Sequence, residues 1–290
     1  MRRWIVIGIP YFWLLVLFLI PFLIVFKISL SDTASAMPPY TPLLDFANLR
    51  AFFAGLDFEN YSFIFSDPLY TNAYWASLKI AFISTLLTLI IVYPIAYGMA
   101  RAPKEWQPLL VMFVILPFWT SFLIRVYAWI GILKKEGLLN LFLSNFGIDP
   151  LTIHNTVYAV YIGIIYSYLP FMILPLYASL EKLNPALLEA AQDLGSPPWK
   201  TFWQVTFPLS IPGVMAGCFL VFIPAMGEFV IPDLLGGSDT LMIGKTLWSE
   251  FFSNRDWPLA SAMAVILLFM LVIPIVLFQR NQQNQREAAR

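Results

Sequence analysis

The chain has 290 residues, of which 60% are hydrophobic and only 12% carry a charge. In soluble domains about half of the residues are apolar and about a quarter are charged, so this composition excludes a soluble globular domain. The formal net charge is zero, and the overall charge therefore favours no class of partner.

Six stretches are apolar and long enough to cross a membrane as helices, because about 20 helical residues span a hydrocarbon core of roughly 30 Å. In chain order they cover residues 5–30, 74–99, 108–133, 157–178, 208–232 and 258–279. The first follows Arg2 and Arg3, but it is longer than the apolar core of about 7–15 residues in a signal peptide. We therefore predict an all-α integral membrane protein with six retained transmembrane helices in a single domain, residues 1–290.

The distribution of basic residues predicts which side of the membrane each loop faces. The N-terminus, the loops 100–107 and 179–207 and the C-terminal tail hold nine of them: Arg2, Arg3, Arg101, Lys104, Lys182, Lys200, Arg280, Arg286 and Arg290. The other three loops hold five: Arg50, Lys134, Lys135, Lys245 and Arg255. Because Lys and Arg accumulate in cytoplasmic loops, we expect both termini and the loop 179–207 to be cytoplasmic.

The long first loop, on the opposite side, is acidic. Five carboxylates stand against Arg50 alone: Asp32, Asp45, Asp57, Glu59 and Asp67. An ordinary solvated surface has such a composition, and a surface that attracts a cation or a docking protein is the alternative.

Several aromatic residues lie deep in the third and fourth predicted spans: Trp119, Tyr127, Trp129, Tyr166 and Tyr168. Ammonium groups are attracted to aromatic faces, and most strongly to Trp. Trp119 and Tyr127 are therefore candidates for the path of an amine. Packing against lipid or against other helices is the alternative for each ring.

Residues 184–195 predict a short amphipathic helix in the loop between the fourth and fifth spans. Asn184 can cap its N-terminus and Pro185 suits the first helical position. Four residues share one face at helical spacing: Leu187, Ala190, Ala191 and Leu194. Gly195 suits a left-handed stop. A helix with small residues on its apolar face can dock closely against a partner outside the membrane.

The fifth span contains an acidic residue, Glu228, among the helix breakers Pro224, Gly227 and Pro232. A charged group at the centre of a span costs about 2.5–3.5 kcal/mol on insertion scales. Breaks in a helix at membrane depth are tolerated where they face protein or a water-filled cavity. We therefore predict a bent or interrupted helix in which Glu228 lines a cavity and could bind a cation.

The candidate substrate pathway joins this segment to the third span and comprises Glu228, Trp119, Tyr127, Arg125, Phe222 and Asp233. A structural ion pair between Glu228 and Arg125 is the alternative role for the acid. The two roles are compatible if a substrate displaces Arg125.

The segment Glu189-Ala190-Ala191, followed by Gly195 and by Val205-x-Phe207-Pro208, resembles the EAA loop of permease subunits of bacterial ABC importers. In that family the pattern is E-A-A, three residues, Gly, nine residues and I-x-L-P, so only the tail departs, and conservatively. Residues 117–129 and 251–258 look like polyamine-importer permeases, and residues 227–237 look most like the putrescine-type permease.

This resemblance implies the type I ABC importer permease fold. It implies as partners a second homologous six-span permease, two copies of a cytoplasmic ATPase and a periplasmic polyamine-binding protein. It also implies that Glu189, Ala190, Ala191, Leu194 and Gly195 belong to a coupling helix that docks on the ATPase. The expected function is ATP-driven import of polyamine, foremost putrescine, through the inner membrane, with spermidine or another small cation as the alternative.

The chain lacks the residues that a multi-His metal site, a His-based catalytic triad or an ATP-binding P-loop requires. His154 is the only histidine, so neither a multi-His metal site nor a His-based catalytic triad can form. Gly244-Lys245-Thr246 resembles the end of a P-loop, but Asp239 stands where the first Gly is required. We therefore expect a transport subunit with no catalytic residues, no nucleic-acid partner and no bound metal or cofactor, ATP and Mg²⁺ belonging to the partner ATPase.

Three other classes of protein fit the sequence less well than this function. An ion-driven secondary transporter would need acids in several spans and usually has internal repeats, whereas the chain has one strong acid and no convincing repeat. An anion permease could use Lys79 and Arg125, but the acidic outer loop and Glu228 favour a cation. A membrane enzyme or a free-standing scaffold is the third class, and the missing nucleophile–base pairs argue against an enzyme.

Overall fold

The computed structural model describes residues 2–43, 54–238 and 240–288, and most of them are helical. The contacts between residues divide the chain into two compact units, Met1–Tyr74 with Ile243–Arg290, and Trp75–Met242. The long helix α5 (Pro68–Arg101) begins in the first unit and continues in the second.

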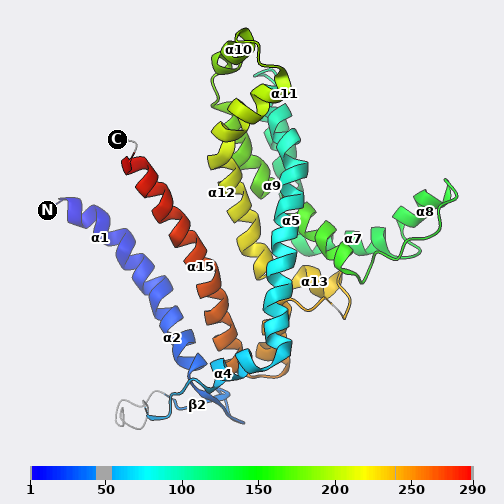
Figure 1. The fold of residues 1–290 in the computed structure, drawn as a ribbon. Helices are drawn as coiled ribbons and strands as arrows, with labels where there is room; N and C mark the ends of the chain where they lie inside the picture. The colour runs from blue at the N-terminus through cyan, green and yellow to red at the C-terminus, as the bar shows by residue number, and fades with distance from the viewer. Residues whose placement is uncertain (1, 44–53, 239, 289–290) are drawn as a thin grey trace. The chain divides into compact units, whose positions relative to one another are not determined.

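In the first unit, α15 (Trp257–Ala288) packs along α2 (Ile20–Ser29) and α4 (Glu59–Ser66) (Figure 1). The remaining elements are α1 (Arg2–Leu14), the π-helical turn η1 (Leu15–Leu19), the antiparallel strands β1 (Asp32–Thr33) and β2 (Tyr40–Thr41), α14 (Ile243–Trp248) and the π-helical turn η4 (Ser249–Ser253). Asp256 caps α15, since its carboxylate accepts hydrogen bonds from the Leu259 N–H at 3.0 Å and the Thr33 hydroxyl at 2.8 Å.

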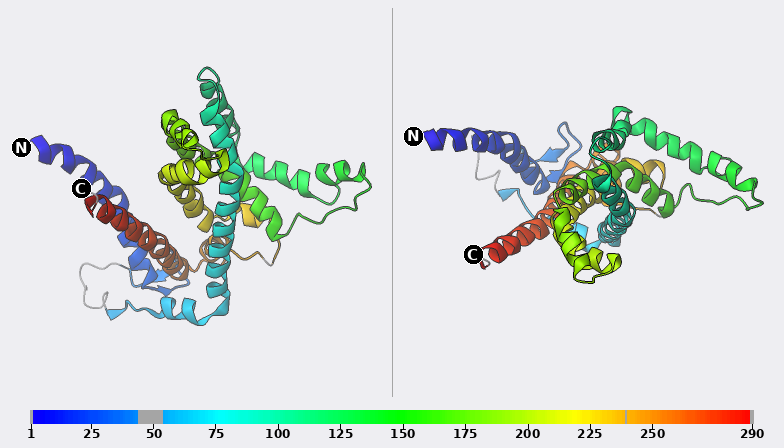
Figure 2. Two further views of the ribbon diagram at one scale, coloured as in Figure 1. Left: turned by 45° about the horizontal axis from the view of Figure 1, so that its top comes forward. Right: turned by 90° about the horizontal axis from the view of Figure 1, so that it is seen from above.

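In the second unit, α9 and α12 pack against each other, and α7 leads to α8, which points away from them (Figures 1 and 2). Its elements after α5 are α6 (Gln107–Ile115), the 3₁₀ turn η2 (Leu116–Trp119), α7 (Phe122–Leu133), α8 (Leu138–Ser144), α9 (Val157–Glu181), α10 (Pro185–Asp193), α11 (Pro198–Thr201), the π-helical turn η3 (Phe202–Thr206), α12 (Phe207–Met226) and α13 (Val230–Leu234). Residues from α5, α9 and α12 form its core, including Val92, Ala96, Met172, Leu176 and Val221.

Among the described residues, four helices are long and apolar enough to cross a membrane: Ile7–Ser29, Pro68–Arg101, Val157–Glu181 and Pro198–Met226. They contain most of the first, second, fourth and fifth predicted spans. The third predicted span is a bent pair, Gln107–Trp119 and Phe122–Ser144, with an angle of 88° between its parts. The apolar part of α15, Trp257–Ile273, is shorter than the other spans, so the number six stays a prediction.

The bend in the third predicted span has a local cause. Pro117 has no N–H to donate to the helix ladder, and the Thr120 hydroxyl donates to the Pro117 carbonyl at 2.8 Å. Thr120 and Ser121 then adopt ψ angles of 150° and 137°, which are not helical. The helix therefore ends at Trp119 and a new one begins at Phe122.

The packing of α12 on α9 depends on two glycines four residues apart, Gly213 and Gly217, a spacing that lets membrane helices approach closely. A Cβ at Gly213 would lie 2.4 Å from the Ser179 Cβ and 2.9 Å from the Pro175 carbonyl oxygen. We expect Gly213→Leu to lower the midpoint of thermal unfolding in detergent by roughly 5 °C, since overpacking costs about 1–3 kcal/mol. Gly98→Leu is the control, because a Cβ there meets no atom within 4 Å; equal shifts for both variants would contradict the prediction.

Candidate substrate pathway and coupling segment

The predicted helix in the loop before the fifth span is confirmed as α10, with both expected ends. The Asn184 side chain accepts a hydrogen bond from the Ala186 N–H at 3.1 Å. At the other end Gly195 has φ +82°, its N–H donates to Gln192 at 2.8 Å, and the Ser196 N–H donates to Ala191 at 3.0 Å. This pair of bonds is a Schellman motif.

The apolar face of α10 is largely open. Leu194 is 89% exposed and Leu187 is 48% exposed, while Ala190 is exposed and Ala191 is partly buried. Glu189, also exposed, lies on the same short helix. An exposed apolar face on a capped helix outside the spans has the form that a docking helix requires.

The segment after α10 ties it to the spans. Phe207, in the tail of the EAA-like motif, opens α12 and packs its ring 5.9 Å from Tyr93 of α5 and 5.1 Å from Trp203. The Tyr93 hydroxyl also hydrogen-bonds the Ser210 hydroxyl at 2.8 Å. A displacement of α10 is therefore linked through packed aromatic rings to α5 and α12.

The predicted interruption of the fifth span is confirmed at Glu228. Helix α12 ends at Met226, and α13 begins at Val230. One carboxylate oxygen of Glu228, Oε1, accepts hydrogen bonds from the N–H groups of Val230 at 3.0 Å and Ile231 at 3.3 Å. The side chain thus caps α13, and it is buried, with 7% of its surface exposed.

The other carboxylate oxygen of Glu228, Oε2, accepts a hydrogen bond from the hydroxyl of Tyr168 on α9. Helix α13 can lie close to α9 because Gly163 has no side chain; a Cβ there would lie 2.8 Å from Ile231. The sequence analysis considered Tyr168 only as one of several aromatic rings deep in the spans and assigned no role to its hydroxyl. Because a buried carboxylate needs hydrogen-bond donors, a tyrosine hydroxyl near Glu228 could have been predicted as one of them.

In the described ranges, no hydrogen bond or ion pair joins Glu228 to Trp119, Tyr127, Phe222 or Arg125. Trp119 is 78% exposed and Tyr127 is 57% exposed; Phe222 is partly buried and Asp233 is exposed. The pairing of Glu228 with Arg125 is not observed in the described part of the chain. The Arg125 guanidinium instead lies over the Phe118 ring, 5.1 Å from its centroid.

A second buried carboxylate with a tyrosine donor lies in the first unit and was missed by the sequence analysis. Glu250 is 8% exposed. It accepts hydrogen bonds from the Tyr70 hydroxyl at 3.0 Å and from the Asn254 side chain at 2.8 Å. Glu250 lies in the short π-helical turn η4, where the hydrophobic residues do not repeat at the spacing of an α-helix. The hydropathy pattern therefore could not predict that Glu250 is buried.

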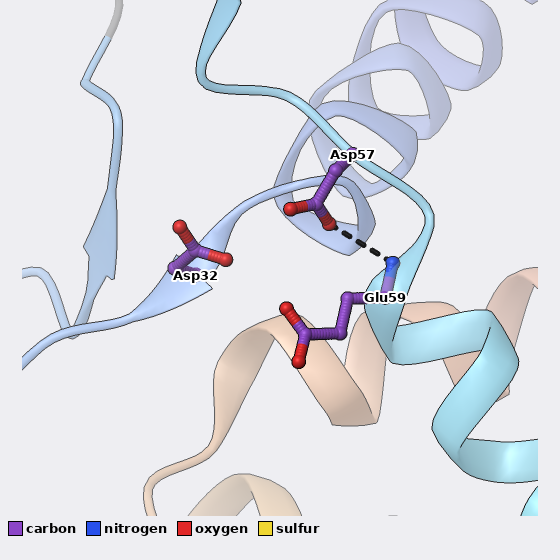
Figure 3. A group of neighbouring side chains, drawn as sticks. All are labelled: Asp32, Asp57 and Glu59. Atoms are coloured by element: carbon purple, nitrogen blue, oxygen red, sulfur yellow. Dashed lines mark hydrogen bonds between the residues drawn. The ribbon is translucent and has the colours of Figure 1, made fainter.

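Part of the acidic outer loop is gathered in space. Oxygen atoms of Asp32, Asp57 and Glu59 lie within 4.8 Å of one another (Figure 3). Asp57 also accepts a hydrogen bond from the Glu59 N–H at 2.9 Å. All three are exposed, so the cluster is compatible with a solvated surface as well as with a cation-attracting one. Asp45 and Arg50 lie outside the described residues.

Comparisons with known proteins identify the family. Residues 93–286 match the family described as the binding-protein-dependent transport system inner membrane component. The spermidine/putrescine transport system permease protein PotB of Haemophilus influenzae is 41% identical over 278 residues, which cover 95% of this chain and 92% of that protein.

Two solved structures share the fold. The crystal structure of a bacterial ABC transporter involved in the import of the acidic polysaccharide alginate has a TM-score of 0.70, 17% identity and coverage of 98% of this chain and 96% of that one. The crystal structure of the bacterial alginate ABC transporter in complex with an alginate pentasaccharide-bound periplasmic protein has a TM-score of 0.62 and 20% identity. It covers 96% of each chain. These likenesses confirm the predicted ABC importer permease fold. The chain belongs to the inner membrane components of binding-protein-dependent transport systems, the permease subunits of ABC importers.

Proposed function

We propose that this permease carries polyamines from the periplasm to the cytoplasm. The observation that carries the proposal is the likeness, over nearly the whole chain, to a permease named for spermidine and putrescine. Within this class we propose putrescine as the substrate, on the basis of residues 227–237, and spermidine is the alternative. As a transport subunit the chain leaves ATP hydrolysis to a partner.

Glu228 supplies the chemistry that an amine requires. Its carboxylate has three hydrogen-bond donors, from Tyr168, Val230 and Ile231, but no cationic partner within ion-pair distance among the described residues. An ammonium group could therefore interact with a carboxylate that is already held in place. Trp119, Tyr127, Phe222, Asp233 and Arg125 complete the proposed pathway.

The proposed assembly follows from the proposed topology of six spans with cytoplasmic termini. The exposed face of α10 docks on one of two cytoplasmic ATPase subunits, a second permease completes the membrane domain, and the loaded binding protein docks on the acidic outer loop. ATP binding moves the docked α10, and the aromatic contacts of Phe207 transmit the movement to α5 and α12. Alternating access then exposes Glu228 first to the periplasm and later to the cytoplasm.

Uptake of labelled putrescine tests this function in proteoliposomes that contain the full complex. We expect uptake to require ATP and the binding protein, and to be inhibited by spermidine and agmatine but not by neutral amino acids. Inhibition by spermidine at much lower concentration than by putrescine would assign spermidine as the main substrate. Uptake that needs an ion gradient but no ATP would contradict the proposal.

A further inference from the structure

The second unit contains an apolar groove of about 460 Å³ beside the aromatic contacts that link α10 to α5 and α12, and the proposed function assigns it no occupant. Its α5 wall includes Leu89, Ile90 and Tyr97, and its other wall includes Phe202, Trp203 and Phe207 of η3 and α12. A groove of this size is within the range of about 300–1,000 Å³ of small-molecule sites. Because its lining is apolar or aromatic, its occupant must present hydrocarbon.

The walls of the groove are held in place by edge-on contacts between aromatic rings. The ring of Phe202 lies edge-on to Tyr93, at 5.4 Å, and to Tyr97, at 6.1 Å. Trp203 lies edge-on to Phe202 at 5.2 Å. The groove is therefore preformed and does not depend on its occupant for its shape.

The α5 wall of the groove, from Leu89 to Tyr97, is about 12 Å long, which is slightly less than one leaflet of the hydrocarbon core. Tyr97 and Leu89 precede Arg101, the last residue of α5, by four and twelve positions. At 1.5 Å per residue these positions lie about 6 Å and 18 Å along the helix from Arg101. Half of the hydrocarbon core measures about 15 Å. Ile90, with 61% of its surface exposed, marks the open side of the groove at this depth.

A cation lies at the end of the groove where a lipid headgroup would be. The Arg101 guanidinium lies over the Tyr97 ring, 5.4 Å from its centroid. Arg101 is exposed, and no carboxylate of the described residues lies within ion-pair distance of it. Trp199 and Trp203, which are 72% and 44% exposed, are of the type that gathers at membrane–water interfaces.

We propose that this groove binds an acyl chain of an anionic phospholipid whose phosphate is held by Arg101. A phosphate is the ligand that a guanidinium binds through paired hydrogen bonds. Basic residues beside apolar grooves at the membrane surface bind anionic lipid headgroups in this way.

Native mass spectrometry of the full importer complex tests the headgroup contact. We expect the complex to retain phosphatidylglycerol more strongly than phosphatidylcholine, and Arg101→Gln to reduce the retained phosphatidylglycerol at least fivefold. Lys182→Gln is the control, because Lys182 is an exposed cation outside the groove. Equal retention of both lipids by the unmodified complex, or no effect of Arg101→Gln, would overturn the proposal.

A photo-crosslinking residue at position 90, in the full complex in mixed bilayers, identifies the occupant directly. We expect adducts enriched in phosphatidylglycerol relative to the bilayer, with the enrichment lost in Arg101→Gln. The same residue at position 124, which is 67% exposed on α7, should give adducts with the bulk lipid composition. A crosslink from position 90 to another protein subunit would show that the groove is a subunit interface and would overturn the lipid site.

Discussion

Gly195→Leu is expected to lower ATP-driven putrescine uptake by tenfold or more. At φ +82° a residue with a side chain pays about 1–2 kcal/mol, and 1.4 kcal/mol corresponds to a factor of ten in population. A Cβ at this position meets no atom within 4 Å, so the effect is on the backbone of the helix stop and not on packing. The end of α10 that carries Leu194 would then lose its docking conformation.

Two measurements check this expectation: uptake into proteoliposomes that contain the complete complex, and the amount of ATPase subunit that co-purifies with the permease. Gly195→Asn should be milder, because Asn enters the left-handed region more readily. Gly147 offers a matched control, since it has φ +71°, open space at its Cβ and the same pair of bonds, from Gly147 to Ser144 and from Ile148 to Leu143.

Gly147→Leu strains the loop after α8 instead of α10 and should leave the bound ATPase unchanged. If Gly147→Leu and Gly195→Leu reduce ATPase retention to the same degree, general instability is the cause and the coupling role of α10 is wrong. Normal uptake by Gly195→Leu would lead to the same conclusion.

Glu228→Gln is expected to reduce putrescine uptake about tenfold or more while ATP hydrolysis by the complex stays close to that of the unmodified protein. The amide oxygen can still accept the N–H groups of Val230 and Ile231, which keeps the cap of α13. The negative charge is lost, and with it the attraction for an ammonium group. The amide NH2 that replaces Oε2 can donate to the Tyr168 oxygen, so the direction of that hydrogen bond reverses. Uptake rates over a range of putrescine concentrations, measured beside the ATPase rate, check this result.

Two further variants separate charge from structure. Glu250→Gln removes the charge from a second buried carboxylate held by a tyrosine hydroxyl, outside the proposed pathway, and should change uptake less than Glu228→Gln does. Glu228→Ala removes the cap of α13 as well, and should lower thermal stability, by about 1 kcal/mol for a lost cap. Unchanged uptake kinetics in Glu228→Gln would remove Glu228 from the substrate pathway.

Tyr168 shows why part of the site could not be predicted. The chain positions 224–232 contain the signals for an interrupted helix, and the interruption is observed between Met226 and Val230. The donor to Glu228, however, comes from 60 positions earlier in the chain. Several tyrosines of the fourth span had the same local signals, and only the packing of α13 on α9, at Gly163, selects Tyr168.

The sequence by itself determined the membrane class, the family pattern and the local boundaries of α10. The capping residues Asn184 and Gly195 form hydrogen bonds with residues only a few positions away. The ends of α10 can therefore be predicted without knowledge of the rest of the fold. Only the tertiary structure decided that Tyr168 of α9 donates to Glu228 and that Arg125 lies over Phe118 instead of pairing with Glu228. These outcomes depend on which helices meet, and hydrophobic length and charge patterns do not encode the choice of neighbour.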